Sequence, residues 1–261
     1  MPEGDTLHRA ALQVGAVLTG HVPDAVLTPH PRIARDRWPE RLGGRRVEAV
    51  EARGKHLLLH FEGGLAIHSH LRMTGAWRVL GRGQRWPRSP RSAWLVLKCG
   101  EHEVVQFGGP VLEFMTEARV RSDPRLARLG PDLVAEPPFD EALFLRRLRE
   151  DDQTRTLGDV LLDQHVVAGI GNIWKSEGCW LARIDPWRRI SEVSDREALA
   201  LVSGVRPLMQ ESARHGHGGI ARKVYGRTGA PCLRCGAPAL IQARSQGDDA
   251  RTTYWCARCQ A

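Results

Sequence analysis

Four of the six cysteines form the clearest chemical pattern in this sequence. Cys232 and Cys235 make one C-x-x-C pair, Cys256 and Cys259 make a second, and twenty residues lie between the pairs. Thiolates at this spacing are typical of a tetrahedral zinc site. Because four protein ligands leave no open position for substrate, the pattern predicts one structural Zn²⁺ that holds a hairpin too small for its own core. An iron centre or two disulfides are the alternatives.

The 261-residue chain is rich in positive charge. Its formal net charge is +8 and its isoelectric point is about 9.7, which suits a polyanionic partner such as nucleic acid. A basic soluble protein without such a partner would have the same balance. Only four residues are lysine and thirty-four are arginine, whose planar group binds phosphate in a bidentate manner. A GC-rich genome would also produce this excess, and the rarity of lysine draws attention to Lys55, Lys98, Lys175 and Lys223.

The sequence gives no sign of a membrane or secretory segment. No run of eighteen apolar residues appears, which argues against a membrane span. No charged stretch precedes a short apolar one, as a signal peptide would require. Cysteines paired at metal-ligand spacing fit a reducing compartment. We therefore expect a cytoplasmic protein, located at the bacterial nucleoid if it binds DNA.

The N-terminal part of the chain has the pattern of one helix followed by short strands. Apolar residues recur at helical spacing between residues 5 and 18, with Asp5 or Thr6 as the expected N-cap. Strands this close together, with no helix between them, predict an antiparallel sandwich or barrel. The strand-like runs are 46–52, 55–61, 65–70, 76–80, 93–98, 103–107 and 111–115.

Beyond residue 120 the apolar period becomes helical. The segment 121–138 is rich in proline and charge, and we interpret it as the link between the two halves. An AGIG turn precedes Asn172, and the free N–H groups at a helix start can bind an anion such as a DNA phosphate. An ordinary helical hairpin with Asn172 as N-cap is the simpler interpretation of that stretch alone. The predicted helices are 140–150, 156–164, 172–182 and 195–210, with a loop at 214–219.

Several short motifs, taken in order, resemble one enzyme family. They are MPEGDT at the start, GKHLLLHF (54–61), SHLRMTGAW (69–77), LLDQHVVAGIGN (161–172), KVYGRTGAPCLRCG (223–236) and RTTYWCARCQ (251–260). Each motif is weak alone. In this combination the chain is similar to the formamidopyrimidine-DNA glycosylase and endonuclease VIII family from its first residue nearly to its last, and it is closer to endonuclease VIII.

The resemblance implies an α+β fold in three parts. Residues 1–120 would form an N-terminal catalytic β-sandwich of antiparallel strands with an N-terminal helix. Residues 121–222 would form a helical DNA-binding domain with a helix-two-turn-helix, and residues 223–261 a four-cysteine β-hairpin zinc finger. The resemblance also implies a bifunctional DNA glycosylase and AP lyase of base excision repair, acting as a monomer on damaged double-stranded DNA.

The resemblance gives the opening stretch MPEGDT a chemical role. Removal of Met1 would leave Pro2 with a free secondary amine, and an α-amino group titrates near ~8, so a fraction of it is neutral and nucleophilic. Amines form Schiff bases with carbonyl carbons, which would let Pro2 attack the sugar C1′ and begin β- and then δ-elimination. Glu3 matches the general acid of the family. Asp5 matches a nearby carboxylate, but a role as helix cap explains it as well.

Other residues match catalytic or DNA-contacting positions of the family. Lys55 matches the lysine that contacts phosphate and assists β-elimination, although by type alone it would be an ordinary surface lysine. Arg251 matches the zinc-finger arginine that binds phosphate and assists δ-elimination. Arg128 and Asn172 match DNA-contacting positions, and His70 is expected to touch a phosphate.

Enzymes that act on a base must take it out of the stack, and another group must fill the space that it leaves. Arg72, Met73 and Thr74 occupy the wedge position of the family. The flexible, apolar side chain of Met73 can stand between bases. Without the motif, Met73 would be interpreted as a core residue at a sheet edge.

The two branches of the family differ in substrate. PEGD and RTTYWC resemble endonuclease VIII, which acts on oxidised pyrimidines, whereas Met73 resembles the formamidopyrimidine branch, which acts on oxidised purines such as 8-oxoguanine. The stretch 106–114 lacks the arginine–phenylalanine wedge of that branch, and 211–227 is short for the loop that covers 8-oxoguanine. Oxidised pyrimidines and abasic sites are therefore the favoured substrates. A non-catalytic zinc-ribbon DNA-binding protein is the alternative from another class, which the intact PEG start and Lys55 disfavour.

Overall fold

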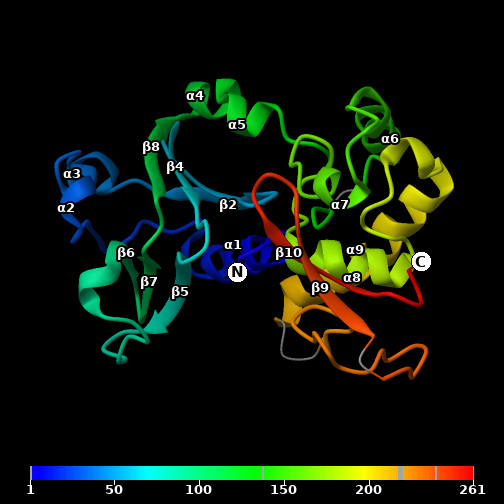
Figure 1. Ribbon diagram of the computed structural model, residues 1–261. Helices are drawn as coiled ribbons and strands as arrows, with labels where there is room; N and C mark the ends of the chain where they lie inside the picture. Colours follow the sequence, from blue (N-terminus) through cyan, green and yellow to red (C-terminus); the bar gives the residue numbers. More distant parts are fainter. Residues whose placement is uncertain (1, 137, 217–219, 239, 261) are drawn as a thin grey trace. The chain divides into compact units, whose positions relative to one another are not determined.

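The computed structural model describes residues 2–136, 138–216, 220–238 and 240–260. The chain divides into two compact units, Met1–Ala127 and Arg128–Ala261, and Figure 1 shows their secondary structure. The boundary falls within the segment 121–138 that the composition marks as a link.

The first unit consists of one long helix, eight strands and several short helical segments. In chain order these are α1 (Gly4–Leu18), β1 (Ala25–Leu27), α2 (Pro31–Ala34), α3 (Trp38–Leu42), β2 (Val47–Arg53), β3 (His56–Phe61), β4 (Leu65–His70), β5 (Ala76–Gly81), η1 (Pro90–Ser92), β6 (Ala93–Cys99), β7 (His102–Phe107), β8 (Val111–Thr116), α4 (Glu117–Ser122) and α5 (Pro124–Ala127). All seven strands expected from the sequence are present. The three-residue β1 is too short to give a period and was not predicted.

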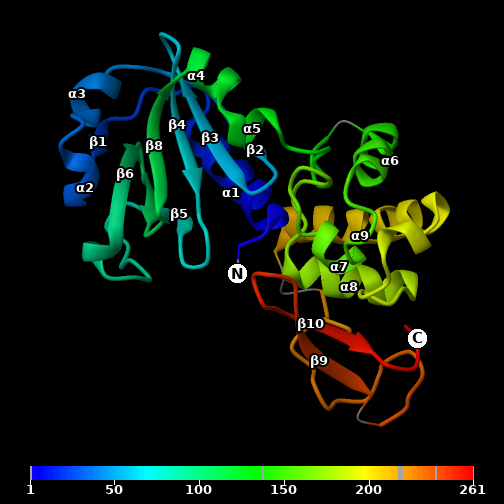
Figure 2. The ribbon, with the colours of Figure 1, turned by 45° about the horizontal axis from the view of Figure 1, so that its top comes forward.

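The strands form two four-stranded antiparallel sheets, ordered β2-β3-β4-β8 and β1-β6-β7-β5. Figure 2 shows the two sheets from a second direction. One apolar core takes side chains from both sheets, which is the arrangement of a β-sandwich. The contributing residues include Leu57, Phe61 and Ile67 from the first sheet and Leu95, Leu97 and Val104 from the second. The predicted sandwich is therefore confirmed.

Helix α1 packs against β2, β3 and β5, and its apolar face joins the same core. The expected capping residue is wrong. Glu3 is the N-cap, and Thr6 is the N3 residue whose Oγ1 accepts a hydrogen bond of 3.4 Å from the backbone N–H of Glu3. Asp5 lies in the first turn, where its negative charge is favourable to the helix dipole. The helix thus begins two residues after Pro2.

The second unit is helical and ends in a hairpin. Its elements are α6 (Glu141–Glu150), α7 (Leu157–Val160), α8 (Asn172–Ala182), η2 (Ile190–Glu192), α9 (Asp195–His215), β9 (Ile241–Gln246) and β10 (Arg251–Cys256). The predictions for α6 and α8 are confirmed. Helix α7 is shorter than the predicted 156–164. Helix α9 continues to His215, so the loop expected from 214 begins at Gly216, whose φ of 83° ends the helix. Residues 217–219 of that predicted loop lie outside the described residues.

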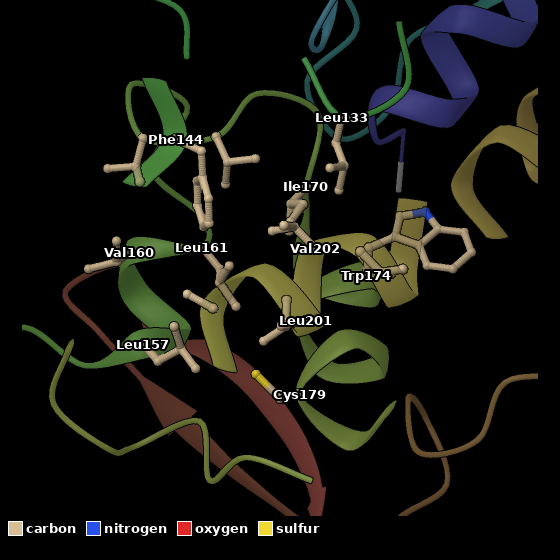
Figure 3. Packing of buried hydrophobic residues seen from close by; sticks show 14 of the residues in the cluster. Leu133, Phe144, Leu157, Val160, Leu161, Ile170, Trp174, Cys179, Leu201 and Val202 are labelled. Atoms are coloured by element: carbon tan, nitrogen blue, oxygen red, sulfur yellow. The ribbon is translucent and has the colours of Figure 1, made fainter. Parts of the chain in front are cut away.

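A second apolar core lies inside this unit (Figure 3). Trp174 and Cys179 from α8 pack with Leu201 and Val202 from α9, and Phe144 of α6 closes the cluster. Burial raises the pKa of the Cys179 thiol to about 12, so this cysteine behaves as a small apolar residue. No helix in the described part of the chain is long and apolar enough to cross a bilayer.

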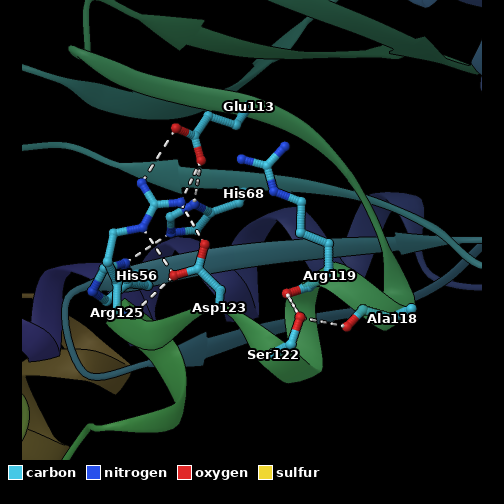
Figure 4. Close-up of polar contacts among 8 residues, drawn as sticks. All are labelled: His56, His68, Glu113, Ala118, Arg119, Ser122, Asp123 and Arg125. Carbon is cyan, nitrogen blue, oxygen red and sulfur yellow. Dashed lines mark hydrogen bonds and ion pairs between the residues drawn. The ribbon is translucent and has the colours of Figure 1, made fainter.

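A polar network that contains the buried His56, His68 and Asp123 lies on the sheet β2-β3-β4-β8 of the first unit (Figure 4). His56 Nδ1 and His68 Nε2 are 2.8 Å apart, and His68 Nδ1 lies 3.3 Å from a carboxylate oxygen of Glu113. Arg125 binds Glu113 and Asp123, with shortest distances of 2.6 Å to each. Because the carboxylate accepts from His68 Nδ1–H, His68 Nε2 must accept from His56 Nδ1–H. Both rings are therefore held neutral in defined tautomers.

Burial opposes protonation of these histidines. It lowers the pKa of His56 to about 2 and also lowers the pKa of His68. The unfolded chain takes up protons on these rings below about pH 6.5 while the folded chain does not, so the free energy of unfolding falls as the pH falls through that value.

We predict that His56→Gln flattens this acid loss of stability. Each histidine held neutral costs roughly 1.4 kcal/mol per pH unit below its unfolded pKa, and the variant removes one such group while keeping a hydrogen-bond donor. Urea unfolding at pH 6.5, 6.0 and 5.5, followed by tryptophan fluorescence, measures the slope. The matched control is His102→Gln, because His102 is exposed. Equal slopes for the two variants would contradict the assignment.

Candidate DNA-binding and catalytic residues

The predicted nucleophile and general acid stand at the start of helix α1. Pro2 is half-buried, and Glu3 is completely buried as the N-cap of α1. Because α1 packs against β2, β3 and β5, the sandwich holds Glu3 and the first turn of the helix in place. Asp5 is also fully buried, and its carboxylate accepts a 2.8 Å hydrogen bond from the backbone N–H of Thr6. A structural role is thereby sufficient to explain Asp5.

Three predicted DNA contacts, Lys55, His70 and Arg72, come together in the first unit. Lys55 follows Gly54 in the tight turn between β2 and β3, and Gly54 has a left-handed φ of 57°. His70 ends the neighbouring strand β4, where it pairs in register with His56. Burial, and then the charges of Arg72 and Lys55, lower the pKa of His70 to about 4. His70 is consequently neutral at physiological pH.

The hydrogen bonding of His70 fixes its tautomer. Its Nδ1 accepts a 3.1 Å hydrogen bond from the backbone N–H of Arg72, so the neutral ring carries its proton on Nε2. Nε2–H is then a donor for an acceptor such as a phosphate oxygen. The ring of His70 also meets His56 edge to face, with centroids 4.8 Å apart.

The predicted wedge, residues 72–74, forms an exposed turn. Gly75 closes it by donating to the carbonyl of Leu71 at 2.9 Å, and a Cβ at Gly75 would lie 2.4 Å from the carbonyl oxygen of Gly108. Arg72 has a φ of 49°, and Met73 is 53% exposed. The interpretation of Met73 as a core residue is therefore wrong. An exposed apolar side chain on a tightly closed turn is the form that a wedge between bases requires.

The remaining predicted DNA contacts lie in the second unit. Arg128 is exposed, and its carbonyl accepts a 2.8 Å hydrogen bond from Arg147. Asn172 is the first residue of α8, with Gly171 as N-cap, so it is not the cap that the simpler interpretation required. Its Nδ2 donates to the carbonyl of Thr252 at 2.7 Å. The direct contacts of Arg128 and Asn172 with DNA stay predictions.

Arg251 begins strand β10 of the C-terminal hairpin. It is half-buried, and its Nη2 lies 3.5 Å from a carboxylate oxygen of the exposed Asp249. In the hairpin register it faces Gln246 of β9. The strand carries Arg251 at its start and Cys256 at its end, so the same element links the predicted phosphate-binding arginine to the cysteine cluster.

The four paired cysteines converge. Their sulfur atoms all lie within 4.8 Å of one another, with Cys232 to Cys259 at 3.9 Å and Cys235 to Cys256 at 3.8 Å. Four ligands about 2.3 Å from a tetrahedral zinc ion would have their sulfurs about 3.8 Å apart. The cluster can therefore bind a metal ion and is compatible with zinc.

Some residues near these sites were not singled out by type and spacing. His56, His68 and Gln246 are buried polar residues whose partners come from other parts of the chain, and nothing in the local sequence indicates those partners. Lys175 is completely buried in α8. The rarity of lysine in this chain was the one signal that pointed to it.

Comparison with known proteins agrees with this geometry over the whole chain. The formamidopyrimidine-DNA glycosylase N-terminal domain matches residues 1–110, and the H2TH domain of the same enzymes matches residues 129–224. A probable endonuclease 8 2 from Streptomyces coelicolor is 39% identical over 268 residues, which cover 100% of this chain and 94% of the relative. An endonuclease 8 from Klebsiella pneumoniae is 31% identical over 269 residues, covering 100% of both chains.

Solved structures show the same fold bound to damaged DNA. A Lactococcus lactis formamidopyrimidine-DNA glycosylase in complex with DNA containing N7-benzyl-Fapy-dG matches with a TM-score of 0.83 and 25% identity, covering 99% of each chain. The same enzyme in complex with DNA containing an abasic site matches with a TM-score of 0.84. The chain described here belongs to the formamidopyrimidine-DNA glycosylase and endonuclease VIII family of base excision repair, whose members are DNA glycosylases with AP lyase activity.

Proposed function

We propose that this enzyme excises oxidised pyrimidines from double-stranded DNA and then cuts the abasic site through a Schiff base on Pro2. The observation that carries the proposal is the pairing of Pro2 with the fully buried Glu3 at the start of a helix that the sandwich holds in place. A binding protein would have no need of a fixed N-terminus with these two residues. The full-length similarity to endonuclease 8 proteins supports the same reaction.

The proposed chemistry begins after removal of Met1. The Pro2 nitrogen attacks C1′, the damaged base departs, and the C1′–O4′ bond opens to give an iminium ion, with Glu3 supplying the proton to O4′. The iminium withdraws electrons and acidifies the C2′ proton. Loss of that proton breaks the C3′–O bond, and the 3′ phosphate leaves with the electron pair. Loss of a C4′ proton and cleavage of the C5′–O bond then release the second phosphate.

The other residues bind and shape the substrate. Lys55 and Arg251 bind phosphates at the β- and δ-elimination steps, and His70 donates Nε2–H to a phosphate oxygen as a neutral group. Arg72 and Met73 fill the space of the extruded nucleotide, with Thr74 completing the turn. Arg128 and Asn172 contact the DNA backbone from the second unit.

Oxidised pyrimidines are the proposed substrates because the sequence relatives are endonuclease 8 proteins and because 106–114 lacks the arginine–phenylalanine wedge. One observation favours the second candidate, an oxidised purine such as 8-oxoguanine. Met73 stands exposed where the formamidopyrimidine branch carries its methionine, and the solved relatives include a complex with a formamidopyrimidine lesion. We further propose that the enzyme acts as a monomer at the nucleoid.

We propose that the cysteine cluster holds one structural zinc ion. The sulfur spacing matches a tetrahedral set, and all four ligand positions are taken by protein. Zinc would then stabilise the hairpin that carries Arg251 without taking part in the reaction.

Borohydride trapping tests the reaction and the substrate together. We expect the enzyme to form a covalent adduct with an abasic duplex and with a duplex carrying an oxidised pyrimidine, and to form less with one carrying 8-oxoguanine. Pro2→Gly keeps an N-terminal amine but replaces the secondary amine, and we expect at least a tenfold loss of adduct, corresponding to about 1.4 kcal/mol in the barrier. Adduct formed equally well by the variant would exclude Pro2 as the nucleophile, and stronger trapping on 8-oxoguanine would favour the purine branch.

Salt dependence separates the two phosphate contacts of the first unit. Each charged contact contributes about 0.9 to the slope of log affinity against log salt. We therefore predict that Lys55→Ala makes this slope shallower by about 0.9 on a duplex with an uncleavable abasic analogue. His70→Ala weakens binding at every salt concentration but leaves the slope unchanged, because His70 is neutral. An equal loss of slope in both variants would show that His70 binds as a cation.

Removal of one cysteine tests the metal. We predict that Cys256→Ser loses its zinc and most of its affinity for DNA, while the apolar core of the sandwich keeps its cooperative unfolding. Metal analysis and duplex binding measure the two losses. Cys99→Ser serves as the control, because Cys99 is outside the cluster. Unchanged affinity in the zinc-free variant would remove the hairpin from the DNA-binding surface.

A further inference from the structure

Lys175 is a completely buried cation in the middle of helix α8. An ammonium group taken out of water costs several kcal/mol unless bound partners compensate for its lost hydration. A methionine or leucine would fill the same space without that cost. The Nζ of Lys175 donates to the Thr253 hydroxyl of strand β10 at 2.5 Å. This hydrogen bond to the hairpin therefore offsets part of the free energy that burying the Lys175 ammonium costs.

This contact belongs to a row of three between α8 and β10, which we call the α8–β10 seam. The three helix residues are spaced i, i+3 and i+4, so they share one face of the helix. They meet three successive residues of the strand. The contacts are Asn172 Nδ2 to the Thr252 carbonyl at 2.7 Å, Lys175 Nζ to Thr253 Oγ1 at 2.5 Å, and the Tyr254 N–H to Ser176 Oγ at 3.4 Å.

The middle contact continues to the strand opposite Arg251. The Thr253 hydroxyl accepts a hydrogen bond from Lys175 Nζ and donates one to Gln246 Oε1 at 2.7 Å. Gln246 is the register partner of Arg251 in the hairpin. Its Nε2 donates to Thr156 Oγ1 at 2.9 Å and to the Pro186 carbonyl at 2.8 Å. The side-chain amide of Gln246, the residue opposite Arg251, is thus held through Thr253 by helix α8 and directly by Thr156 and Pro186.

Gly158 makes room for this arrangement. A Cβ at Gly158 would lie 2.3 Å from Oε1 of Gln246, closer than any real contact. Gln246 is itself only 5% exposed. The side chain of Gln246 is therefore tightly packed. Replacing Thr253 or Lys175, to which it is linked, would move strand β10 or break a hydrogen bond.

We propose that Lys175 is a positioning residue for Arg251, acting through Thr253 and Gln246. The proposal rests on the role of Arg251 in δ-elimination given above. Arg251 is the first residue of β10, and the hairpin turn that precedes it, residues 247–250, is exposed. The orientation of its guanidinium therefore depends on how firmly the strand is held behind it. The seam and Gln246 hold it, and Lys175 supplies the central contact.

The test compares the products of the two elimination steps. Thr253→Val removes the hydroxyl that joins Lys175 to Gln246 while preserving shape. We expect the ratio of δ to β product to fall roughly 10- to 100-fold, the scale of a misplaced catalytic group, with unchanged borohydride trapping and zinc content. Lys175→Met should give the same shift, and Thr253→Ser should restore the ratio. The matched control is Thr154→Val, which removes the hydroxyl of an exposed threonine that donates to Asp152 Oδ1 at 2.7 Å.

A double variant separates positioning from general damage. If Lys175 acts through Arg251, Thr253→Val in an Arg251→Ala background lowers δ-elimination no further. A loss of β and δ products in equal proportion, or full additivity in the double variant, would overturn the inference. So would an unchanged ratio in Thr253→Val and Lys175→Met. If the unaltered enzyme forms no trapped adduct, the proposed function itself is wrong; if it is trapped but yields no δ product, the role of Arg251 and this inference fall while Pro2 stands.

Discussion

The requirement that buried polar groups be hydrogen-bonded governs both units of this protein. A polar side chain in the interior costs free energy unless a partner replaces its water, and each unit meets this demand with a chain of side chains drawn from several elements. In the first unit the chain runs from Arg125 through Glu113 and His68 to His56. In the second it runs from Lys175 through Thr253 to Gln246. Both chains end beside residues that the proposed reaction uses.

Such networks fix geometry more strictly than apolar packing does. An apolar core tolerates a shifted side chain at modest cost, whereas a displaced partner in a buried network leaves a donor or acceptor without its bond. His56 pairs in register with His70, and Gln246 pairs in register with Arg251. Through these pairs the networks constrain the positions of two of the proposed phosphate contacts. Phosphate recognition needs it, because elimination depends on where the charge lies relative to the leaving oxygen.

The sequence predicted the fold because the apolar periods were strong and local. Strands such as 55–61 and 65–70 and helix 172–182 are recognisable from neighbouring residues alone, and the cysteine spacing needs no tertiary information. The three-residue strand β1 was missed, and the predicted helix 156–164 extended beyond α7, because the limits of both elements depend on packing partners. The cap of α1 was misassigned because a Glu N-cap is less common than Asp or Thr.

The candidate site divides in the same way. The type and spacing of the four cysteines identified them directly, whereas Pro2, Glu3 and Lys55 were singled out because the short motifs around them resemble those of one family. The neutral state of His70 could not be predicted, because it arises from burial and from the nearby charges of Arg72 and Lys55. The seam between α8 and β10 joins residues about eighty positions apart, and no local pattern encodes such a pairing.

Charge and shape then contribute differently to recognition. The net charge of +8 attracts any duplex, because phosphate contacts carry no information about the base. Discrimination must come from the cost of extruding a nucleotide, which is lowest for a damaged or unpaired base. In the proposed function, stacking of the exposed Met73 in the gap would offset part of that cost. The neutral His70 would add a directional hydrogen bond without adding to the nonspecific attraction. At the proposed site, the cations would therefore supply affinity through charge, whereas His70 would supply it only where a phosphate oxygen lies in the direction of its Nε2–H.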